Sequence, residues 1–345
     1  MATGETGSAA APEKEPAPPQ TTAAAPAERV DVAVNIFAKP YQTALSVLSL
    51  LKQSAPHVGT LWLQYEPMGS RYDSVSPYVV ARYLQEELQW PSRVFQPGFW
   101  LAREPVDETR LGDAAYRMGI RYQHAFEHSK SPKLLLMHND VFVFKDALGD
   151  MLAAMGDAFA IGSIGQCWNC PAHKEPVVKD VLGCEPCGPD TYGDFRPDAA
   201  TLRRLYARTR ELGIFVRPYD EGFAEGFDQQ PWPLPECRVN EWFCLLDLEK
   251  TRPHCAPFGP ALPPGAFSAC GPCNLDTAVP WFRAMHALGF HARHFGLERH
   301  LRHWVGTGNK TPRRYALAED NARRLLQTHF PDYMAWLGRV TDKSA

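Results

Sequence analysis

The sequence lacks a long apolar run, an excess of positive charge and an internal repeat. None of its apolar runs approaches the roughly 18 residues that a membrane-spanning helix needs. Residues 1–28 also lack the apolar centre of a secretory signal peptide. The formal net charge of −3 gives no electrostatic reason to expect a nucleic acid or an anionic membrane as partner. Together these absences predict a cytoplasmic protein.

The composition that remains is that of a globular chain. Its 345 residues, 45% hydrophobic and 22% charged, can bury a large core as one big domain or two ordinary ones. Residues 1–28 differ, since they are mostly Ala, Pro, Glu, Thr and Gly. Such a segment cannot bury enough apolar surface to offset its ordering entropy, so we predict a disordered tail there.

Ordered elements are expected from residue 29 onward. A β-rich run over 29–37 is followed by Pro40, which is well placed to open a helix, and by a second strand over 60–66, which completes a βαβ unit. Further strands are expected at 133–137, 141–144, 158–165, 240–247 and 290–295. Further helices are expected at 76–88, 108–129, 146–155, 201–213, 276–288 and 317–326.

The run Leu134 to Met137 suits a strand that is buried on both faces. The polar triplet His138, Asn139 and Asp140 follows it. In an open α/β sheet, ligands bind beyond the carboxyl ends of the strands, and a carboxylate there can hold a hard divalent cation. An edge turn, in which Asn139 and Asp140 satisfy their own backbone, explains the triplet equally well.

Charged residues outside the triplet can be interpreted either as parts of a functional site or as ordinary solvated surface charges. On the helix expected at 108–129, Arg117, Arg121 and His124 recur on one face. This basic face is either simply solvated or directed at the edge where the triplet lies. Glu66 closes the second strand and is, taken alone, a solvated charge at a strand end.

Six of the nine cysteines form three C-x-x-C pairs: Cys167/Cys170, Cys184/Cys187 and Cys270/Cys273. The first two pairs have nearly the spacing of a two-knuckle structural zinc site, in an irregular insertion around 166–195. The third pair can replace either of them. Buried unligated cysteines and a redox dithiol are the alternatives.

Several of these features together resemble the glycosyltransferases of the GT-A fold, in particular inverting, family 2-like members. The opening strand and helix, with Asn35, Phe37 and Lys39, resemble the donor-binding start of those enzymes, and His138-Asn139-Asp140 resembles their D-x-D metal motif. His138 departs from the first acidic position of that motif. The resemblance covers roughly residues 30–310.

Two downstream features extend the resemblance. Asn274-Leu275-Asp276-Thr277, followed by a helix and Gly289-Phe290, resembles the motif in which an acidic residue serves as general base. The family often supplies a further metal-ligating histidine beyond the next strand, and His303 fits that position better than His294 or His300.

The resemblance implies an α/β fold with a Rossmann-like sheet, flanked by helices and carrying Cys/Pro/Gly-rich loop insertions, in a single catalytic domain over 29–345. It implies transfer of a sugar, hexosyl in type, from a nucleoside-diphosphate sugar to a saccharide or other hydroxyl acceptor, assisted by Mn²⁺ or Mg²⁺.

The implied site residues fall into three groups. The catalytic candidates are Asp276, first, and Glu241, second. The donor-binding candidates are Asn35, Phe37, Lys39, Glu66, Arg117, Arg121, His138 and Asn139. The metal candidates are Asp140 and His303, with Cys167, Cys170, Cys184 and Cys187 for structural zinc.

Three hypotheses about the function of the chain therefore remain. The first is the metal-assisted inverting transferase. The second is a non-catalytic, zinc-stabilised α/β binding protein in which Asp140 is a turn residue and Asp276 a helix cap. The third is an enzyme that hydrolyses its donor or transfers the sugar to a protein. Trp168, Trp232 and Trp242 lie in or beside irregular loops, where they either stack on an acceptor sugar or, more commonly, belong to the core.

Overall fold

The computed structural model describes residues 28–67, 73–222, 227–271, 273–303 and 311–342. The tail predicted over 1–28 therefore lies, except for residue 28, outside the described residues. One seven-stranded sheet forms the centre, in the order β10-β6-β7-β4-β1-β2-β3. Two small two-stranded sheets, β11-β5 and β8-β9, accompany it. The strands are β1 (Val30–Ile36), β2 (Val58–Tyr65), β3 (Ser92–Phe95), β4 (Lys133–His138), β5 (Val141–Val143), β6 (Ala160–Ile164), β7 (Val239–Asp247), β8 (Ser268–Cys270), β9 (Cys273–Leu275), β10 (Ala292–His294) and β11 (Leu301–His303).

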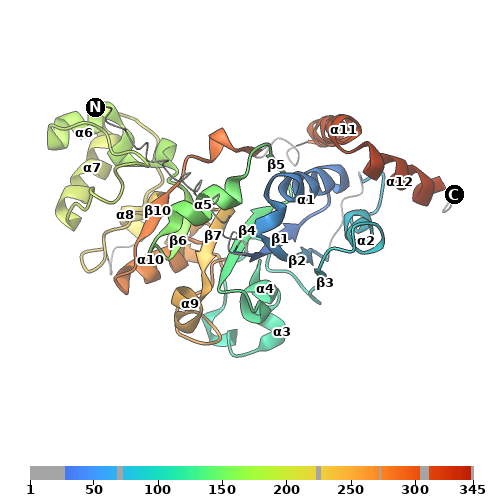
Figure 1. Cartoon of the computed structure of the whole chain (residues 1–345). Helices are drawn as coiled ribbons and strands as arrows, with labels where there is room; N and C mark the ends of the chain where they lie inside the picture. Colours follow the sequence, from blue (N-terminus) through green and yellow to red (C-terminus); the bar gives the residue numbers. More distant parts are fainter. Residues whose placement is uncertain (1–27, 68–72, 223–226, 272, 304–310, 343–345) are drawn as a thin grey trace, which may run out of the picture.

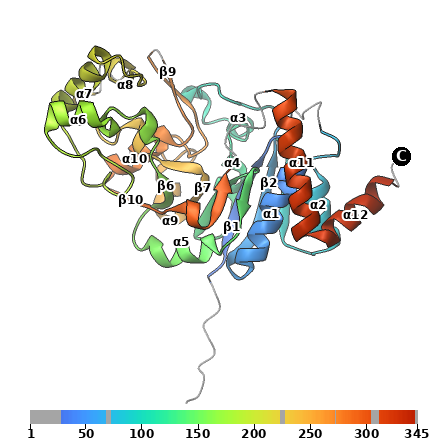
Figure 2. The same ribbon diagram turned by 90° about the horizontal axis from the view of Figure 1, so that it is seen from above.

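Helices cover both faces of the large sheet (Figure 1). The α-helices are α1 (Pro40–Ser54), α2 (Val79–Glu86), α3 (Ala114–Arg117), α4 (Gln123–His128), α5 (Ala147–Met155), α6 (Glu175–Leu182), α7 (Ala199–Glu211), α8 (Tyr219–Gly222), α9 (Leu248–Thr251), α10 (Val279–Ala287), α11 (Pro312–His329) and α12 (Pro331–Asp342). Figures 1 and 2 both show α6, α7 and α8 gathered at one end of the molecule and α11 and α12 near the other. None of the described helices is long and apolar enough to cross a membrane.

The central strand β4 shows why the sheet is buried on both sides. Its side chains alternate between two hydrophobic clusters: Leu135 and Met137 pack with α1, α2, α5, α11 and α12, whereas Leu134 and Leu136 pack with α4, α7 and α10. Alternation of this kind follows from the two-residue period of a strand. The four-residue apolar run in the sequence is the signature of this arrangement, and the predicted α/β class is confirmed.

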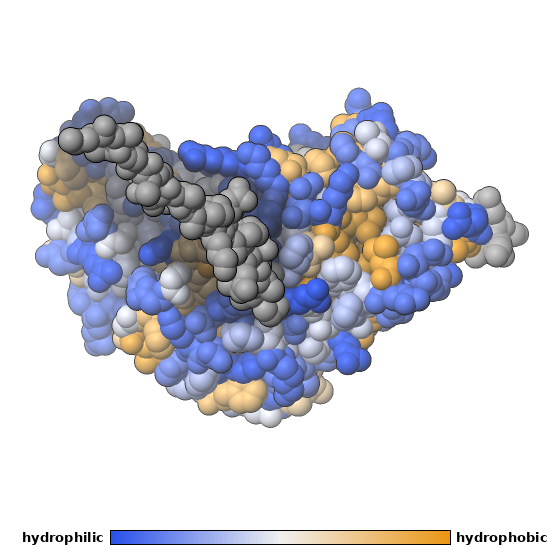
Figure 3. All heavy atoms as spheres, viewed as in Figure 1, coloured by the Kyte–Doolittle hydropathy of each residue, from blue (hydrophilic) through white to orange (hydrophobic). Residues whose placement is uncertain are grey.

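The polarity of the strands brings several chain segments to one edge of the sheet. β1, β2 and β4 are parallel, and β7 runs antiparallel to both β4 and β6. The carboxyl ends of β1, β4 and β6 and the amino end of β7 therefore share one edge, which we call the site edge. The surface seen in Figure 3 is hydrophilic over most of its area, with hydrophobic side chains in separate patches, as is usual for a folded chain.

The single helix predicted over 108–129 is wrong. The chain instead forms a short 3₁₀ turn at Glu108–Arg110, then α3 and α4, and Tyr122 between the two helices has a positive φ of 63°. The carboxylates of Asp107 and Asp113 each accept a bond from the backbone N–H two residues later, so each starts a new short turn. The predicted basic face therefore does not exist as one helical stripe.

Among the described residues, four further helices lie outside the predicted ones, and two of them, α8 and α9, are only four residues long. α6 lies inside the Cys-rich insertion, and α12 follows α11 at the end of the described chain. α11 contacts the start of α1 directly. The carboxylate of Glu319 accepts bonds from the backbone N–H groups of Tyr41 and Gln42, at 3.0 and 3.2 Å. An anionic group at a helix N-terminus satisfies the donors that the first turn leaves unpaired.

Candidate functional site

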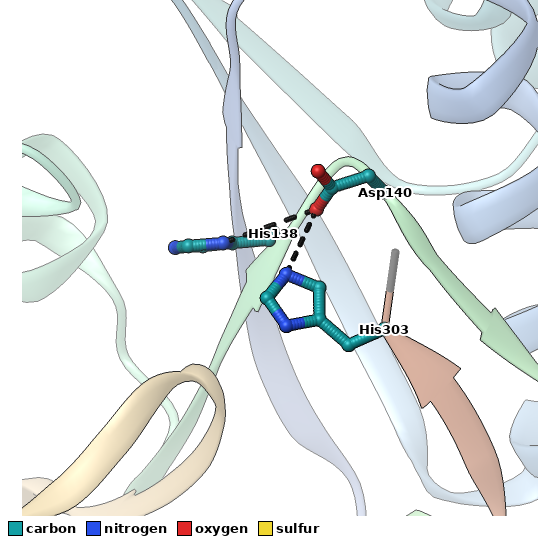
Figure 4. Close-up of side chains that lie close together, drawn as sticks. All are labelled: His138, Asp140 and His303. Carbon is teal, nitrogen blue, oxygen red and sulfur yellow. Dashed lines mark hydrogen bonds and ion pairs between the residues drawn. The ribbon is translucent and has the colours of Figure 1, made fainter. Parts of the chain in front are cut away.

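His138, Asp140 and His303 converge at the site edge. β4 ends at His138, the chain turns through Asp140 into β5, and β11 pairs with β5 so that His303 lies opposite Val141. Nε2 of His303 lies 3.1 Å, and Nδ1 of His138 3.9 Å, from Oδ1 of Asp140. Figure 4 shows both rings directed at that one oxygen. One ligand atom from each residue lies within 4.8 Å of the other two, close enough for the three side chains to share one metal ion.

Lys39 forms an ion pair with the other carboxylate oxygen of Asp140. Its ammonium nitrogen lies 2.7 Å from Oδ2, and both side chains are only 8% exposed. Lys39 precedes α1 in a left-handed backbone conformation, with φ at 57°. Its N–H donates to the hydroxyl of Tyr315 at 2.9 Å, so α11 helps to fix it. Asp140 thus keeps Oδ1 for the two histidines.

Asn139 anchors the turn instead of facing a ligand. Its side-chain amide donates to the carbonyl of Ala38 at 3.2 Å and to Thr43 Oγ1 at 2.9 Å, with a longer contact to the carbonyl of Phe37. The turn is therefore held by the loop between β1 and α1, not by its own backbone as a plain edge turn would be. Asn35, at the end of β1, donates to Glu66 at 2.9 Å. These bonds tie three strand ends of the site edge together.

Glu241 and Asp276 meet through an arginine. Nη2 of Arg238 lies 3.0 Å from Oδ2 of Asp276 and 3.6 Å from Oε2 of Glu241, and the arginine side chain is 3% exposed. On its other side, Glu241 Oε1 lies 3.6 Å from Nε2 of His138. The two predicted catalytic carboxylates are thus joined to the metal-type group by a continuous set of charged contacts.

The charged groups of this edge keep the buried carboxylates ionised. Burial alone would raise the pKa of Asp140, but the bond from His303 and the charge of Lys39 outweigh it and hold the pKa well below its usual range. Burial is likewise outweighed at Glu241, where His138 and Arg238 lower the pKa to about 2. Burial lowers the pKa of His303 despite its contact with Asp140. His303 is therefore neutral near pH 7, as a metal-ligating imidazole must be.

The two candidate arginines have different surroundings. Arg121 lies between α3 and α4, its guanidinium is 5.9 Å from the Trp100 ring, and its charge acts on Glu66. Burial nevertheless raises the pKa of Glu66. Arg117 is held in a buried pair with Glu127, at 2.9 Å, and by the carbonyl of Leu111. Because Arg117 is neutralised by Glu127, Arg121 is the better candidate for a fixed positive charge near the site edge.

Asp276 does not cap a helix. α10 begins at Val279, and its N-cap is Ala278, which has a left-handed conformation and no capping side chain. Asp276 instead accepts a bond from the Thr277 N–H at 2.9 Å and pairs with Arg238, and its side chain is 34% exposed. The interpretation of Asp276 as a helix cap is therefore wrong.

Sequence reasoning missed Arg238 and Tyr122 at this edge and did not foresee the contact that Trp242 makes. Arg238 lies three positions before Glu241, a spacing that gives no signal in a strand. Tyr122 is buried within electrostatic range of Glu241, Asp140 and Glu66. Trp242 stacks on His303, with ring centroids 4.6 Å apart and planes 14° from parallel. Trp242 therefore orients the histidine, whereas Trp168 is 65% exposed and does not belong to the core.

The residues present fit a divalent transition ion. Two imidazoles and one carboxylate are donors that such ions accept, and Mg²⁺ by contrast prefers an all-oxygen set. Nδ1 of His303 is buried and has no hydrogen-bond partner among the described residues. A buried ring nitrogen without a partner, next to the other ligand atoms of the group, fits a bound cation.

The four cysteines predicted to share zinc are not arranged as expected. Cys170 and Cys187 are buried and Cys167 is half-buried, but Cys184 is exposed. Among the side chains that the structure describes, the three-residue group with ligand atoms within 4.8 Å is the histidine–aspartate one, not a cysteine group. Cys270 and Cys273 are paired positions in the backbone ladder of the β8-β9 hairpin.

No protein-family model and no curated protein matches the sequence. Among solved structures, the chain is similar to the mannosyltransferase PcManGT from Pyrobaculum calidifontis, in complex with GDP-Man and Mn²⁺. The identity is 10% over 78% of this chain and 55% of that one, with a TM-score of 0.40. It is also similar to core-mannan synthase A from Aspergillus fumigatus in its Mn/GDP form, at 12% identity over 82% and 77% of the chains, with a TM-score of 0.37.

A third similar structure is the bifunctional glycosyltransferase WbbM, at 10% identity over 87% of this chain and 45% of that one, with a TM-score of 0.40. The chain thus spans about half the length of PcManGT and of WbbM. At identities of 10 to 12% such likenesses concern the fold alone. The seven-stranded sheet flanked by helices is the Rossmann-like α/β arrangement that the sequence resemblance implies.

Proposed function

We propose that this chain is a glycosyltransferase that moves a hexosyl group from a nucleoside-diphosphate sugar to an acceptor hydroxyl, with inversion and with a divalent cation. The observation that supports it is the convergence of His138, Asp140 and His303 with Lys39 on one side and Glu241, Arg238 and Asp276 on the other. A cation-binding group next to a base and fixed positive charges is what transfer from a diphosphate needs.

The donor diphosphate would lie over the group formed by His138, Asp140 and His303. A cation bound there would neutralise charge on the leaving diphosphate. Lys39 and Arg121 add fixed positive charge at the same edge, and they require no reorganisation because burial and contacts hold them in place. Asn35 and Glu66 border the edge at the end of β1 and β2, where the nucleoside side of the donor would lie.

Asp276 would accept the proton. The acceptor oxygen attacks the anomeric carbon, the bond from that carbon to the diphosphate oxygen breaks, and the hydroxyl proton passes to the Asp276 carboxylate. Arg238 positions that carboxylate from the side of Oδ2. Glu241, with its lowered pKa, is a weak base and instead supplies negative charge next to His138.

The proposal is tested by screening nucleoside-diphosphate sugars for release of the diphosphate. The full chain is assayed with Mn²⁺, with Mg²⁺ and with a chelator, alongside Asp140→Ala. Asp157→Ala is the matched control, because Asp157 is an exposed carboxylate that also pairs with a histidine, His291. Turnover of one donor by wild type and Asp157→Ala, lost in Asp140→Ala, supports the proposal. The donor that is turned over is then assayed with and without acceptor hydroxyls: release that an acceptor accelerates points to transfer, and release at the same rate without acceptor points to hydrolysis. Binding of no donor would return the chain to the class of binding proteins.

A further inference from the structure

Four cysteines from three separate segments lie within electrostatic range of one another at the end of the sheet where α6 and α7 gather. Among the described residues their sulfur atoms do not already form a metal-binding group. Cys167 and Cys170 bracket a 3₁₀ turn, η3 (Cys167–Asn169), and the N–H of Cys170 donates to the carbonyl of Cys167 at 3.0 Å. Cys187 approaches from beyond α6, since its N–H donates to the carbonyl of Ala172 at 2.9 Å. Its thiol is thereby brought beside the segment that carries Cys170.

Cys237 joins this group from a distant part of the chain. It ends a second 3₁₀ turn, η5 (Pro235–Cys237), just before β7. The carbonyl of Glu236 accepts a bond of 2.7 Å from the N–H of Gln166, the residue before Cys167. From the point where a Cβ on Gly165 would lie, Cys167 Sγ is 2.8 Å and the Glu236 carbonyl oxygen 3.7 Å away. Cys167 and Cys237 are thus neighbours through adjacent backbone.

A buried carboxylate without a partner marks the same place. The side chain of Glu236 is 2% exposed, and neither of its oxygens has a hydrogen-bond partner among the described residues. Burying a carboxyl group without a hydrogen-bond partner costs folding free energy. The guanidinium groups of Arg217, Arg238 and Arg283 act on it electrostatically, so positive charge is gathered around this region as well.

We propose that Cys167, Cys170, Cys187 and Cys237 form a structural zinc site, in which Cys237 takes the place that the sequence spacing assigns to Cys184. Four thiolates around one tetrahedral ion are the usual structural zinc arrangement. The ion would draw the sulfurs together and fasten the irregular loops 166–198 and 227–238 to β6 and β7. This site is separate from the histidine–aspartate group and does not depend on the proposed transfer reaction.

Charge and protonation agree with a closed site of this kind. Burial raises the pKa of the Cys187 thiol to about 11 and places those of Cys170 and Cys237 well above their usual range. Without metal these groups are neutral thiols, and zinc binding releases their protons. Arg283 lies within electrostatic range of Cys237, so its charge offsets part of the net negative charge of an ion held by four thiolates.

The test uses zinc content, thiol protection and a cobalt probe, none of which needs an assay of activity. Zinc is measured by mass spectrometry of the elements in the full chain, in Cys237→Ser and in Cys184→Ser. We expect about one zinc per chain in wild type and in Cys184→Ser, and a loss of most of it in Cys237→Ser. Cys244→Ser controls for removal of a buried thiol, because Cys244 lies within β7.

Thiol protection keeps the inference testable if Cys237→Ser fails to fold. Wild type is alkylated before and after chelation, and the labelled positions are mapped on peptides. We expect Cys167, Cys170, Cys187 and Cys237 to become labelled only after chelation, and Cys184 to be labelled in both samples. Cobalt added to the chelated His303→Ala chain should give thiolate-to-metal absorption. Absence of that absorption, a wild type without zinc, or zinc lost from Cys184→Ser and kept in Cys237→Ser would each overturn the site.

Discussion

The ammonium nitrogen of Lys39 lies 2.7 Å from Oδ2 of Asp140, and both side chains are more than nine-tenths buried. This pair divides the roles of the Asp140 carboxylate. Oδ2 is neutralised inside the protein, whereas Oδ1 faces His138 and His303. A carboxylate used in this way retains one oxygen for a cation while its position is fixed from behind.

Replacing Lys39 with Met should destabilise the chain through Asp140. Removing one partner of a buried pair leaves an uncompensated charge and costs about 3–5 kcal/mol. We expect the midpoint of urea unfolding to fall, and addition of Mn²⁺ to recover part of the loss because the cation then compensates Asp140. Lys145→Met, at an exposed lysine of the same region, should change little. An unfolding curve of Lys39→Met that overlies that of wild type would contradict the role given to the pair.

The donor set of the site predicts a preference for Mn²⁺ over Mg²⁺. Two of its three ligands are imidazoles, and Mg²⁺ binds them poorly compared with oxygen ligands. Titration of the chain with Mn²⁺, followed by electron paramagnetic resonance, should show binding that weakens at least tenfold in His303→Ala. His300→Ala is the matched control, since His300 pairs with Asp150 and not with Asp140. Equal affinity for the two ions, or binding unchanged in His303→Ala, would remove the histidines from the site.

Asp276 and Glu241 should differ as bases. Loss of a general base lowers turnover by about 10²–10⁴-fold, and we expect this fall in Asp276→Asn with its thermal stability close to that of wild type. Glu241→Gln should lose less turnover, because the lowered pKa of Glu241, about 2, makes it a weak proton acceptor. Turnover and melting temperature are measured on the same preparations. A larger loss of turnover in Glu241→Gln than in Asp276→Asn would identify Glu241, not Asp276, as the general base.

Glu236 should make stability depend on pH. Burial raises its pKa to about 8, whereas an unfolded glutamate titrates near pH 4.3. Between these two values the folded chain holds a proton that the unfolded chain has released, so the free energy of unfolding should fall as pH rises. The stability that Glu236 contributes is fully present below about pH 4 and lost once the pH passes about 8.

Glu236→Gln should remove this part of the pH dependence, because the amide does not titrate. Urea unfolding of wild type, Glu236→Gln and Glu249→Gln is compared at several values of pH between 4 and 9. Glu249 is exposed, so its replacement should leave the wild-type profile unchanged. Parallel profiles for wild type and Glu236→Gln would show that Glu236 keeps an ordinary pKa in the folded chain.

The elements that the sequence predicts well are those with strong local patterns. β1, α1, β2, β4 and β7 carry runs of apolar residues or a helical stripe that starts at Pro40, and each lies within a few residues of its expected place. The helix expected over 108–129 fails because Asp107 and Asp113 each start a separate turn and Tyr122 breaks the backbone geometry. Local hydrogen bonds there outweigh helical periodicity.

The site is predicted only in part, because its contacts join distant segments. Asp140 and His303 are 163 positions apart, and the β5-β11 pairing that joins them involves three-residue strands with no clear pattern. The contacts of Arg238 with Asp276 and of Tyr315 with Lys39 cannot be predicted from the spacing of these residues in the sequence. The cysteine spacing likewise favours Cys184, whereas the fold brings Cys237 to the group from another part of the chain.

Metal-assisted transfer is tested most directly by nucleoside diphosphate release from nucleotide sugars, with and without chelator, in wild type and in Asp140→Asn. We expect release from one donor in the presence of Mn²⁺, abolished by chelation and reduced by at least about a hundredfold in Asp140→Asn. Release that continues in the presence of chelator and in Asp140→Asn would contradict the role given to His138, Asp140 and His303.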